Sequence, residues 1–392
     1  MRNLGFRVQL LNYSIIQLLF CLCMFTACRD EKEVFTPETE PVTPPVVNAK
    51  MLGFYLLNEG SMGSNKATLD YFDVASGIYH RNIYGDANPS VPKELGDVGN
   101  DLAIYGSKLY AVINCSNKVE VMDKRTARRL GQIDIPNCRY IRFHGGYAYI
   151  TSYAGPVQLD PDYKQHGYVA KVDTATLKVV ATCNVGFQPD ELEIVGDKII
   201  FVANSGGYMP PNYENTLSVI DLNTFTEVKQ IDVAINMYQI RADKYGNLWV
   251  TSRGNYNDIP SKLYWVNGKT EQVGGMIDIA VSNMFMSGDS LYTCSTEWSN
   301  ITMNYEINYA IIDVAKKMIV SRNFITDGTD AEIECPYGIM VAPDTKDIYV
   351  TDAKNFVLPG HLYCFDKNGK KKWDARTGDI PGHFAIVYEE RP

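Results

Sequence analysis

Short apolar segments, rich in aromatic residues and ending in a small polar residue, recur along the chain from about residue 50 onward. Seven copies occur, at residues 54–58, 109–114, 147–152, 199–204, 248–252, 291–295 and 348–352. An apolar run of this length between polar turns is typical of a buried β-strand, and no 3.6-residue helical periodicity accompanies it. The pattern predicts an all-β repeat protein.

A second signature follows each copy: an apolar strand that ends in Asp or Asn at the start of a polar turn. These residues are Asp73, Asp123, Asp173, Asp221, Asn267, Asp313 and Asp366, spaced 46 to 53 residues apart. An Asp or Asn side chain accepts hydrogen bonds from the next backbone N–H groups and so starts a turn. Four short strands in a repeat of this length are typical of a β-propeller blade. We predict seven blades, with six or eight as alternatives.

The two ends of the chain complement each other. The first repeat opens at its second strand, residues 53–58, and lacks a first strand. Residues 380–388 resemble the opening strand of other repeats, such as residues 335–341. We therefore expect the C-terminal strand to complete blade 1 as its innermost strand, which closes the ring and covers two sheet edges. The propeller is predicted to span residues 51–392.

The first residues indicate export. Arg2 and Arg7 precede an apolar run over residues 15–27, which is shorter than the roughly 20 residues that a membrane-spanning helix needs. Residues 1–27 are therefore predicted to be a signal peptide. The sequence Phe25-Thr26-Ala27-Cys28 resembles a bacterial lipobox, apart from Phe25 where leucine is usual. This resemblance implies that Cys28 is diacylated and becomes the mature N-terminus; a plain secretory signal cut near Ala27 is the alternative.

Residues 28–50 are predicted to be a lipidated N-terminus followed by a tether. Residues 29–33 are charged and resemble the tag that sends some lipoproteins to the outer leaflet of the outer membrane. Four prolines and few large apolar residues follow between positions 34 and 50, a composition that favours an extended chain. We expect a protein anchored at the cell surface by its lipid.

The charge of the chain excludes one class of partner. The formal net charge is −9, and loss of Arg2 and Arg7 with the signal peptide makes it about −11. Nucleic-acid-binding proteins need a basic surface, so we expect no nucleic acid partner. Six cysteines lie in the predicted propeller without CxxC spacing. They are predicted to be free and buried, with a Cys115–Cys138 disulfide as the alternative.

Motifs for catalysis are missing from the sequence. It contains no GxGxxG, GxxxxGK[ST], HExxH or GxSxG, and its five histidines lack metal-ligand spacing. We expect no catalytic residue, no resident cofactor and no metal site. His383 is expected near the centre of the ring, as a polar side chain without a partner or, alternatively, as a contact to a ligand or metal. Asp160 and Asp162 are interpreted as part of a solvated loop.

The loops of the predicted propeller differ between its two faces. Loops that follow the second strands are long and aromatic, whereas the opposite face has short turns such as residues 106–107 and 145–146. Tyr and Trp offer rigid contact area with a polar end, and Asn and Ser add adaptable hydrogen bonds. This composition favours a large, mostly uncharged ligand or a protein partner. The candidate binding residues are Asn58, Tyr140, Tyr153, Tyr208, Arg253, Tyr256, Trp298, Tyr337 and Phe356.

These features together resemble those of known surface proteins. Seven blades with Asp turns and strands ending in Asn, Ser or Asp resemble the YVTN-type surface propellers. The lipobox, the charged tag, the Pro-rich tether and the opening Gly-Phe-Tyr-Leu-Leu-Asn-Glu-Gly at residues 53–60 resemble the BtuG lipoproteins of gut Bacteroidota. The resemblance spans nearly the whole chain from Cys28 onward.

The resemblance to BtuG implies capture of cobalamin (vitamin B12) or related corrinoids at the cell surface. It also implies delivery of that ligand to a BtuB-like TonB-dependent transporter in the outer membrane. Two other functions stay open from the residues themselves. One is a surface propeller that binds a glycan or a protein, and the other is a metal-dependent enzyme resembling lactonases or lyases.

Overall fold

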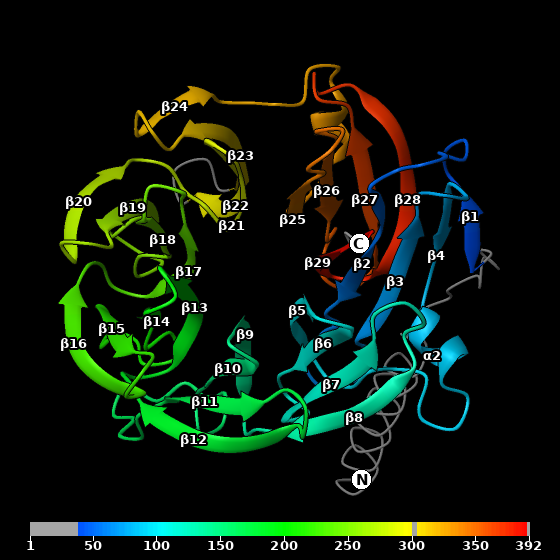
Figure 1. The fold of residues 1–392 in the computed structure, drawn as a ribbon. Coiled ribbons are helices and arrows are strands. Elements are labelled where there is room, and N and C mark those ends of the chain that lie inside the picture. The colour runs from blue at the N-terminus through cyan, green and yellow to red at the C-terminus, as the bar shows by residue number, and fades with distance from the viewer. Residues whose placement is uncertain (1–37, 300–303, 390–392) are drawn as a thin grey trace, which may run out of the picture. The chain divides into compact units, whose positions relative to one another are not determined.

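Seven antiparallel sheets make up the part of the chain that the computed structural model describes, residues 38–299 and 304–389. Each innermost strand contacts the innermost strands of both neighbouring sheets, so the sheets form a closed ring (Figure 1). The prediction of an all-β, seven-bladed β-propeller with four strands per blade is confirmed. The predicted signal peptide and Cys28 lie outside the described residues.

The blades are numbered along the chain, and each runs from an innermost to an outermost strand. The innermost strands of blades 1 to 7 are β29 (Pro381–Tyr388), β5 (Gly99–Tyr105), β9 (Cys138–His144), β13 (Pro189–Val195), β17 (Met237–Ala242), β21 (Asn283–Ser287) and β25 (Pro336–Val341). The second strands are β2 (Met51–Asn58), β6 (Lys108–Ile113), β10 (Tyr147–Ser152), β14 (Ile199–Asn204), β18 (Asn247–Ser252), β22 (Ser290–Ser299) and β26 (Ile348–Asp352).

The outer half of each blade completes the sheet. The third strands are β3 (Thr68–Asp73), β7 (Lys118–Asp123), β11 (Tyr168–Asp173), β15 (Thr216–Asp221), β19 (Lys262–Asn267), β23 (Asn304–Asp313) and β27 (Pro359–Phe365). The outermost strands are β4 (Ile78–His80), β8 (Arg129–Asp134), β12 (Lys178–Asn184), β16 (Thr226–Asp232), β20 (Gln272–Ile277), β24 (Met318–Ser321) and β28 (Lys371–Asp379). Blade 1 carries a fifth strand, β1 (Thr39–Pro41), outside β4.

Two short helical elements interrupt this pattern. Helix α2 (Ile83–Ala87) follows β4, and the 3-10 turn η1 (Thr329–Glu332) precedes β25. Neither was expected, because elements of five and four residues are too short to show helical periodicity. None of the helices in the described residues is long and apolar enough to cross a membrane.

Both faces of each second strand are buried, which explains the apolar runs of the sequence. In β14, for example, every residue after Ile199 is buried, whereas β16 at the outer edge of the same blade is exposed at nearly every position. Seven clusters of the hydrophobic core accordingly lie one at each junction between neighbouring blades, and a small eighth cluster joins Cys335, Ala353 and Ile380. A sheet that is covered on both sides needs apolar residues in succession and not in alternation.

The chain ends meet in blade 1. Strand β29 pairs antiparallel with β2, which places Phe54 opposite Ile386 and Leu56 opposite Phe384. The predicted closure of the ring by the C-terminal strand is confirmed. Phe54 is fully buried there and touches the rings of Tyr349 and Phe384, with centroids 4.9 and 5.4 Å away.

The predicted Asp and Asn turns occur in all seven blades, between the third and fourth strands. The side chain of Asp173 accepts the backbone N–H groups of Ala175 and Thr176, and the other six residues make equivalent bonds. The N–H of Thr176 is the main reason why the pKa of Asp173 lies below the ordinary carboxyl value. These turns lie on the same face as the turns between first and second strands, and we call it the turn face.

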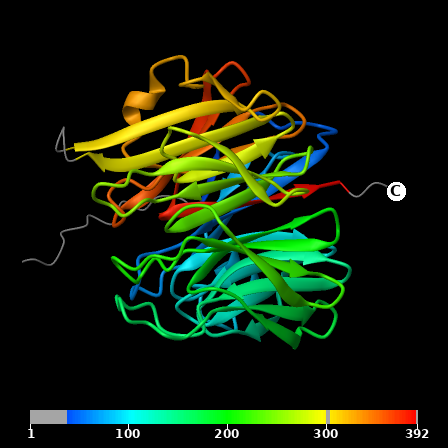
Figure 2. The ribbon, with the colours of Figure 1, turned by 90° about the vertical axis from the view of Figure 1, so that its left-hand side faces the viewer.

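The other face, the loop face, carries the loops after the second strands and the starts of the innermost strands. Strands β22 and β23 of blade 6 are ten residues long and pair along their whole length. In Figure 2 this yellow hairpin extends beyond the other blades on the loop face, opposite the end of β29.

The tether is part of the propeller from Thr39 onward. Strand β1 pairs with β4, and the next residues cross the turn face, where Thr43 donates its N–H to the carbonyl of Gly77. Gly77 has a φ of +71°, and a Cβ there would lie 1.9 Å from the Thr43 oxygen, so only glycine fits under the crossing. The N–H of Met51 then donates to Asp344 of blade 7 at 3.0 Å. We call residues 39–50 the strap.

The closure of the ring leads to a stability prediction. Replacing Phe54 with alanine leaves a cavity between blades 7 and 1 and is expected to lower the free energy of unfolding by about 3–5 kcal/mol. Val228→Ala is the control, because Val228 is 61% exposed on β16. Denaturant unfolding of both variants measures the difference, and equal stabilities would contradict this role of Phe54.

Candidate functional site

The loop face is held together by one hydrogen bond that recurs in six blades. The first backbone N–H after the second strand donates to the carbonyl of the residue just before the innermost strand. The pairs are Glu59 with Ile380, Asn114 with Val98, Tyr153 with Asn137, Ser205 with Gln188, Arg253 with Asn236 and Ala353 with Cys335. Each long loop is therefore attached to the start of an innermost strand, at the centre of the ring.

A pocket of about 440 Å³, which we call the mouth pocket, opens at this centre. Within residues 38–299 and 304–389, residues of every blade except blade 6 line it. Its lining includes Glu59, Asn100, Asn114, Arg139, Tyr208, Tyr238, Arg253, Tyr337, Phe356 and His383. The wall thus combines four aromatic rings with amide and charged groups. That mixture is typical of sites for organic ligands.

Asp190 holds two of these residues in place. Its buried carboxylate accepts hydrogen bonds from Arg139 at 3.0 Å, from Arg253 at 3.3 Å and from the hydroxyl of Tyr153 at 2.7 Å. A buried carboxylate needs such partners, because the loss of hydration is costly. Two guanidinium groups share one carboxylate, so this part of the pocket wall keeps a net positive charge.

Aromatic rings hold the same arginines from the other side. The guanidinium carbon of Arg139 lies 4.7 Å from the ring centroid of Tyr153, and that of Arg253 lies 3.7 Å from the ring centroid of Tyr238. Cations over aromatic faces are attracted electrostatically. The two arginines are therefore fixed in direction before any ligand arrives.

Bulges at the starts of the innermost strands position these side chains. The pairing register shifts near the loop face in six blades, and in β13 the shift falls between Pro189 and Leu192. Consecutive residues of a regular strand point to opposite faces, whereas a bulge changes the direction of a side chain. As a result, Asp190 and Glu191 both reach arginines of neighbouring blades.

Below the mouth pocket, the central channel widens into a second space of about 490 Å³ lined by all seven innermost strands. Arg142 bridges Asp101, at 3.0 Å, and Glu191, and Arg241 also pairs with Glu191. The carboxylates of Asp101 and Glu191 are thus both paired with arginines. Among residues 38–299 and 304–389, no three His, Cys, Asp or Glu side chains come together in a way that could hold a metal ion.

His383 joins the mouth pocket to the channel. Its Nε2 lies 2.9 Å from Glu59, which also accepts the hydroxyl of Tyr337 at 3.0 Å. Burial disfavours the charged imidazole, but the hydrogen bond and the charge of Glu59 outweigh it and raise the pKa of His383. The expectation of a histidine without a partner is therefore wrong, because Glu59, distant in sequence, comes beside it when the ring closes.

Two loops beside the pocket have the same construction. The side chain of Asn255 accepts the N–H groups of Asn257 and Ile259. Tyr256, which follows Asn255, has a φ of +58° and is 66% exposed. In blade 7, Asn355 accepts the N–H groups of residues 357 and 358, and Phe356 has a φ of +62° and is 41% exposed. Left-handed conformations of non-glycine residues cost about 1–3 kcal/mol each, so the hydrogen bonds of Asn255 and Asn355 are what hold these two loops in shape.

The structure brings together part of the predicted set. Tyr208, Arg253, Tyr337 and Phe356 line the mouth pocket, and Tyr256 lies at a nearby loop tip on the same face. The rings of Tyr337 and Phe356 are in edge contact, with centroids 5.8 Å apart.

The other predicted residues lie elsewhere. Tyr140 and Tyr153 are buried and support Tyr238 and Arg139 from behind. Asn58 is fully buried and donates to Thr68 within blade 1. Trp298 belongs to β22, and its side chain lies outside the described part of the structure. The six cysteines from Cys115 to Cys364 are unpaired, as predicted, and the alternative Cys115–Cys138 disulfide does not form. Five of them are buried as expected, whereas Cys115 is only partly buried and lines the mouth pocket.

Four residues of the site are absent from the predicted binding set: Glu59, Arg139, Asp190 and Tyr238. His383 was expected near the centre of the ring, with a ligand contact only as an alternative. A signal was present, because charged residues stand at the start of otherwise apolar strands, as in Cys138-Arg139-Tyr140 and Pro189-Asp190-Glu191. Such a charge inside a buried strand indicates a paired group or a ligand site.

Comparison with known proteins identifies the family and a fold found among solved structures. Residues 52–383 match the family described as "Domain of unknown function (DUF5074)". Among solved structures, hydrazine synthase of Kuenenia stuttgartiensis is similar, with a TM-score of 0.55 and 15% sequence identity over 69% of this chain and 77% of that one. At this identity the likeness concerns the fold alone. No curated protein sequence matches the chain.

The His383–Glu59 contact predicts a pH dependence. The folded-state pKa of His383 is raised above 6.5, so the stabilisation from the charged pair is fully present below pH 6.5 and is lost as the pH rises through the folded-state pKa. We expect Glu59→Gln to lower the free energy of unfolding more at about pH 5.5 than at about pH 9.

Denaturant unfolding at both pH values measures this effect. In a His383→Gln background, Glu59→Gln should have the same effect at both, because only the pH-independent bond to Tyr337 is then lost. A pH-independent effect of Glu59→Gln in the parent protein would refute the prediction.

Proposed function

The chain belongs to the DUF5074 family, and we propose that this member captures a large organic ligand on its loop face without catalysing a reaction. The observation that carries the proposal is a pair of loops, held by hydrogen bonds to the side chains of Asn255 and Asn355. These loops present Tyr256 and Phe356 beside the mouth pocket. These backbones are fixed by hydrogen bonds before binding, which reduces the entropy that binding would otherwise cost.

The proposed ligand is a corrinoid such as cobalamin. This class combines a broad ring, several amide arms and a single phosphate group. Aromatic side chains such as Tyr256 and Phe356 would cover the ring, while Asn100 and Asn114 would meet amide groups. The phosphate would meet the net positive wall at Arg139 and Arg253. The corrin ring would lie across the opening of the mouth pocket.

We propose further that the protein acts at the surface of the outer membrane and passes its ligand to a BtuB-like TonB-dependent transporter. This part rests on the sequence features around Cys28 and on the length of the chain that follows. Eleven residues lead from Cys28 to Thr39, where the strap begins, and they span at most about 40 Å when fully extended. A lipid on Cys28 would therefore keep the propeller close to the membrane.

A surface glycan is the second candidate ligand. Exposed Tyr256 and Phe356 would stack on sugar rings as readily as on a corrin, and the amide groups of the mouth pocket would meet hydroxyl groups. The paired arginines favour the corrinoid, since a neutral glycan offers them no anionic partner.

Calorimetric titration of the protein from residue 29 onward with cyanocobalamin tests the proposal. We expect one-to-one binding and a loss of at least about tenfold in affinity for Tyr256→Ala, because an exposed aromatic anchor contributes more than 1 kcal/mol. Tyr245→Ala is the matched control, since Tyr245 is 46% exposed in a turn between β17 and β18. It lies on the turn face and should leave the affinity unchanged.

Two results would count against the corrinoid. No heat and no co-elution of the red ligand would exclude cobalamin, and binding to outer-membrane polysaccharide would then favour the glycan. Equal effects of the two tyrosine variants would place the ligand away from the loop face.

A further inference from the structure

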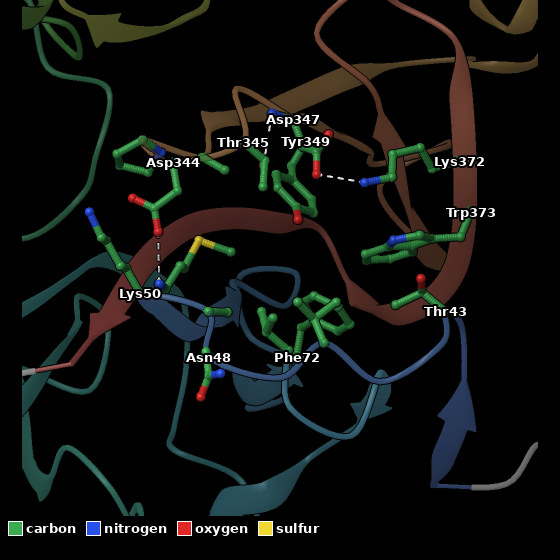
Figure 3. A pocket seen from close by; sticks show the side chains of 16 residues that line it. Thr43, Asn48, Lys50, Phe72, Asp344, Thr345, Asp347, Tyr349, Lys372 and Trp373 are labelled. Carbon is green, nitrogen blue, oxygen red and sulfur yellow. Dashed lines mark hydrogen bonds and ion pairs between the residues drawn. The ribbon is translucent and has the colours of Figure 1, made fainter.

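A third pocket lies on the turn face, opposite the long aromatic loops. It has a volume of about 570 Å³ and lies between the strap and the junction of blades 1 and 7 (Figure 3). Strap residues such as Val46 and Asn48 form one side, and the turn between β25 and β26 forms the other. We call it the strap pocket. A volume of this size is within the range of sites for small organic molecules.

Three aromatic rings from three strands form its floor. Trp373 of β28 lies 4.8 Å from Phe72 of β3 and 5.8 Å from Tyr349 of β26, measured between ring centroids. The ring planes are tilted by 42° and 62°. Because the rings belong to buried, well-paired strands, the floor is rigid. The three side chains are at most 7% exposed, so the floor presents narrow ring edges to a ligand.

The rim of the strap pocket is polar and balanced in charge. Lys372 pairs with Asp347 at 2.7 Å, and Asp344 accepts the N–H of Met51, as the dashed lines in Figure 3 show. Lys50 supplies the other cation of the lining. Two lysines and two aspartates give this rim no net charge, in contrast to the arginine wall of the mouth pocket. A charged ligand would gain little here, whereas polar groups on a neutral ligand would find donors and acceptors.

We propose that the strap pocket is a second binding site, for a small uncharged molecule with a flat aromatic ring system. The face of the ligand ring would lie against the exposed edges of Trp373 and its neighbours, and the strap would cover it. The site depends on the closed ring and on the strap alone, so it is independent of what the mouth pocket binds.

The test uses N-phenyl-1-naphthylamine, a neutral aromatic probe that fluoresces when it leaves water. Titration of the protein from residue 29 onward, which keeps every described strand, should show saturable one-to-one binding. Val46→Trp fills the pocket from its exposed side and should weaken binding by at least about tenfold. Val47→Trp is the matched control, because the neighbouring Val47 is 82% exposed and does not line the pocket.

Two further variants make the result unambiguous. Thr345→Trp narrows the strap pocket from its other side and should also weaken binding, even if Val46→Trp folds poorly. Tyr256→Ala on the loop face should leave probe binding unchanged. The proposal is overturned if the parent protein shows no saturable binding, if the Val46 and Val47 variants behave alike, or if only Tyr256→Ala weakens binding.

Discussion

The pairing of β2 with β29 is the interaction on which the rest of the molecule depends. Each blade buries both of its faces against its neighbours, so an open ring would expose the apolar faces of its two end blades to water. Closure also creates the site. Glu59 and His383 are 324 residues apart and form one contact only because the chain ends share a sheet. Stability and the mouth pocket thus have the same origin.

Charged groups at the centre of the ring link three successive blades. Asp190 of blade 4 holds Arg139 of blade 3 and Arg253 of blade 5, and the next residue, Glu191, holds a second pair from the same two blades. Buried ion pairs add little net stability, but removing one partner strongly destabilises the fold because it leaves the other charge buried without compensation. Their effect here is to fix the directions of arginines that face the pocket.

The two faces of the propeller have different chemistry. The loop face offers exposed rings on hydrogen-bonded loops around a pocket with a positive wall. The turn face has short Asp turns, and the strap crosses it above an aromatic floor with a neutral rim. A ring of repeated blades separates these surfaces naturally, because every odd strand runs toward one face and every even strand runs back.

The sequence by itself determined the number of blades, the Asp turns and the closure by the C-terminal strand. Each is a local pattern: an apolar run, a side chain that bonds its own backbone, or a missing strand. It also located the loops that carry Tyr208, Arg253, Tyr256, Tyr337 and Phe356. The tertiary structure alone decided which side chains meet. The bulges reverse the alternation expected for residues such as Asp190. Glu59 meets His383 across 324 residues of sequence and Arg139 meets Asp190 across 51, so no local pattern could reveal these contacts.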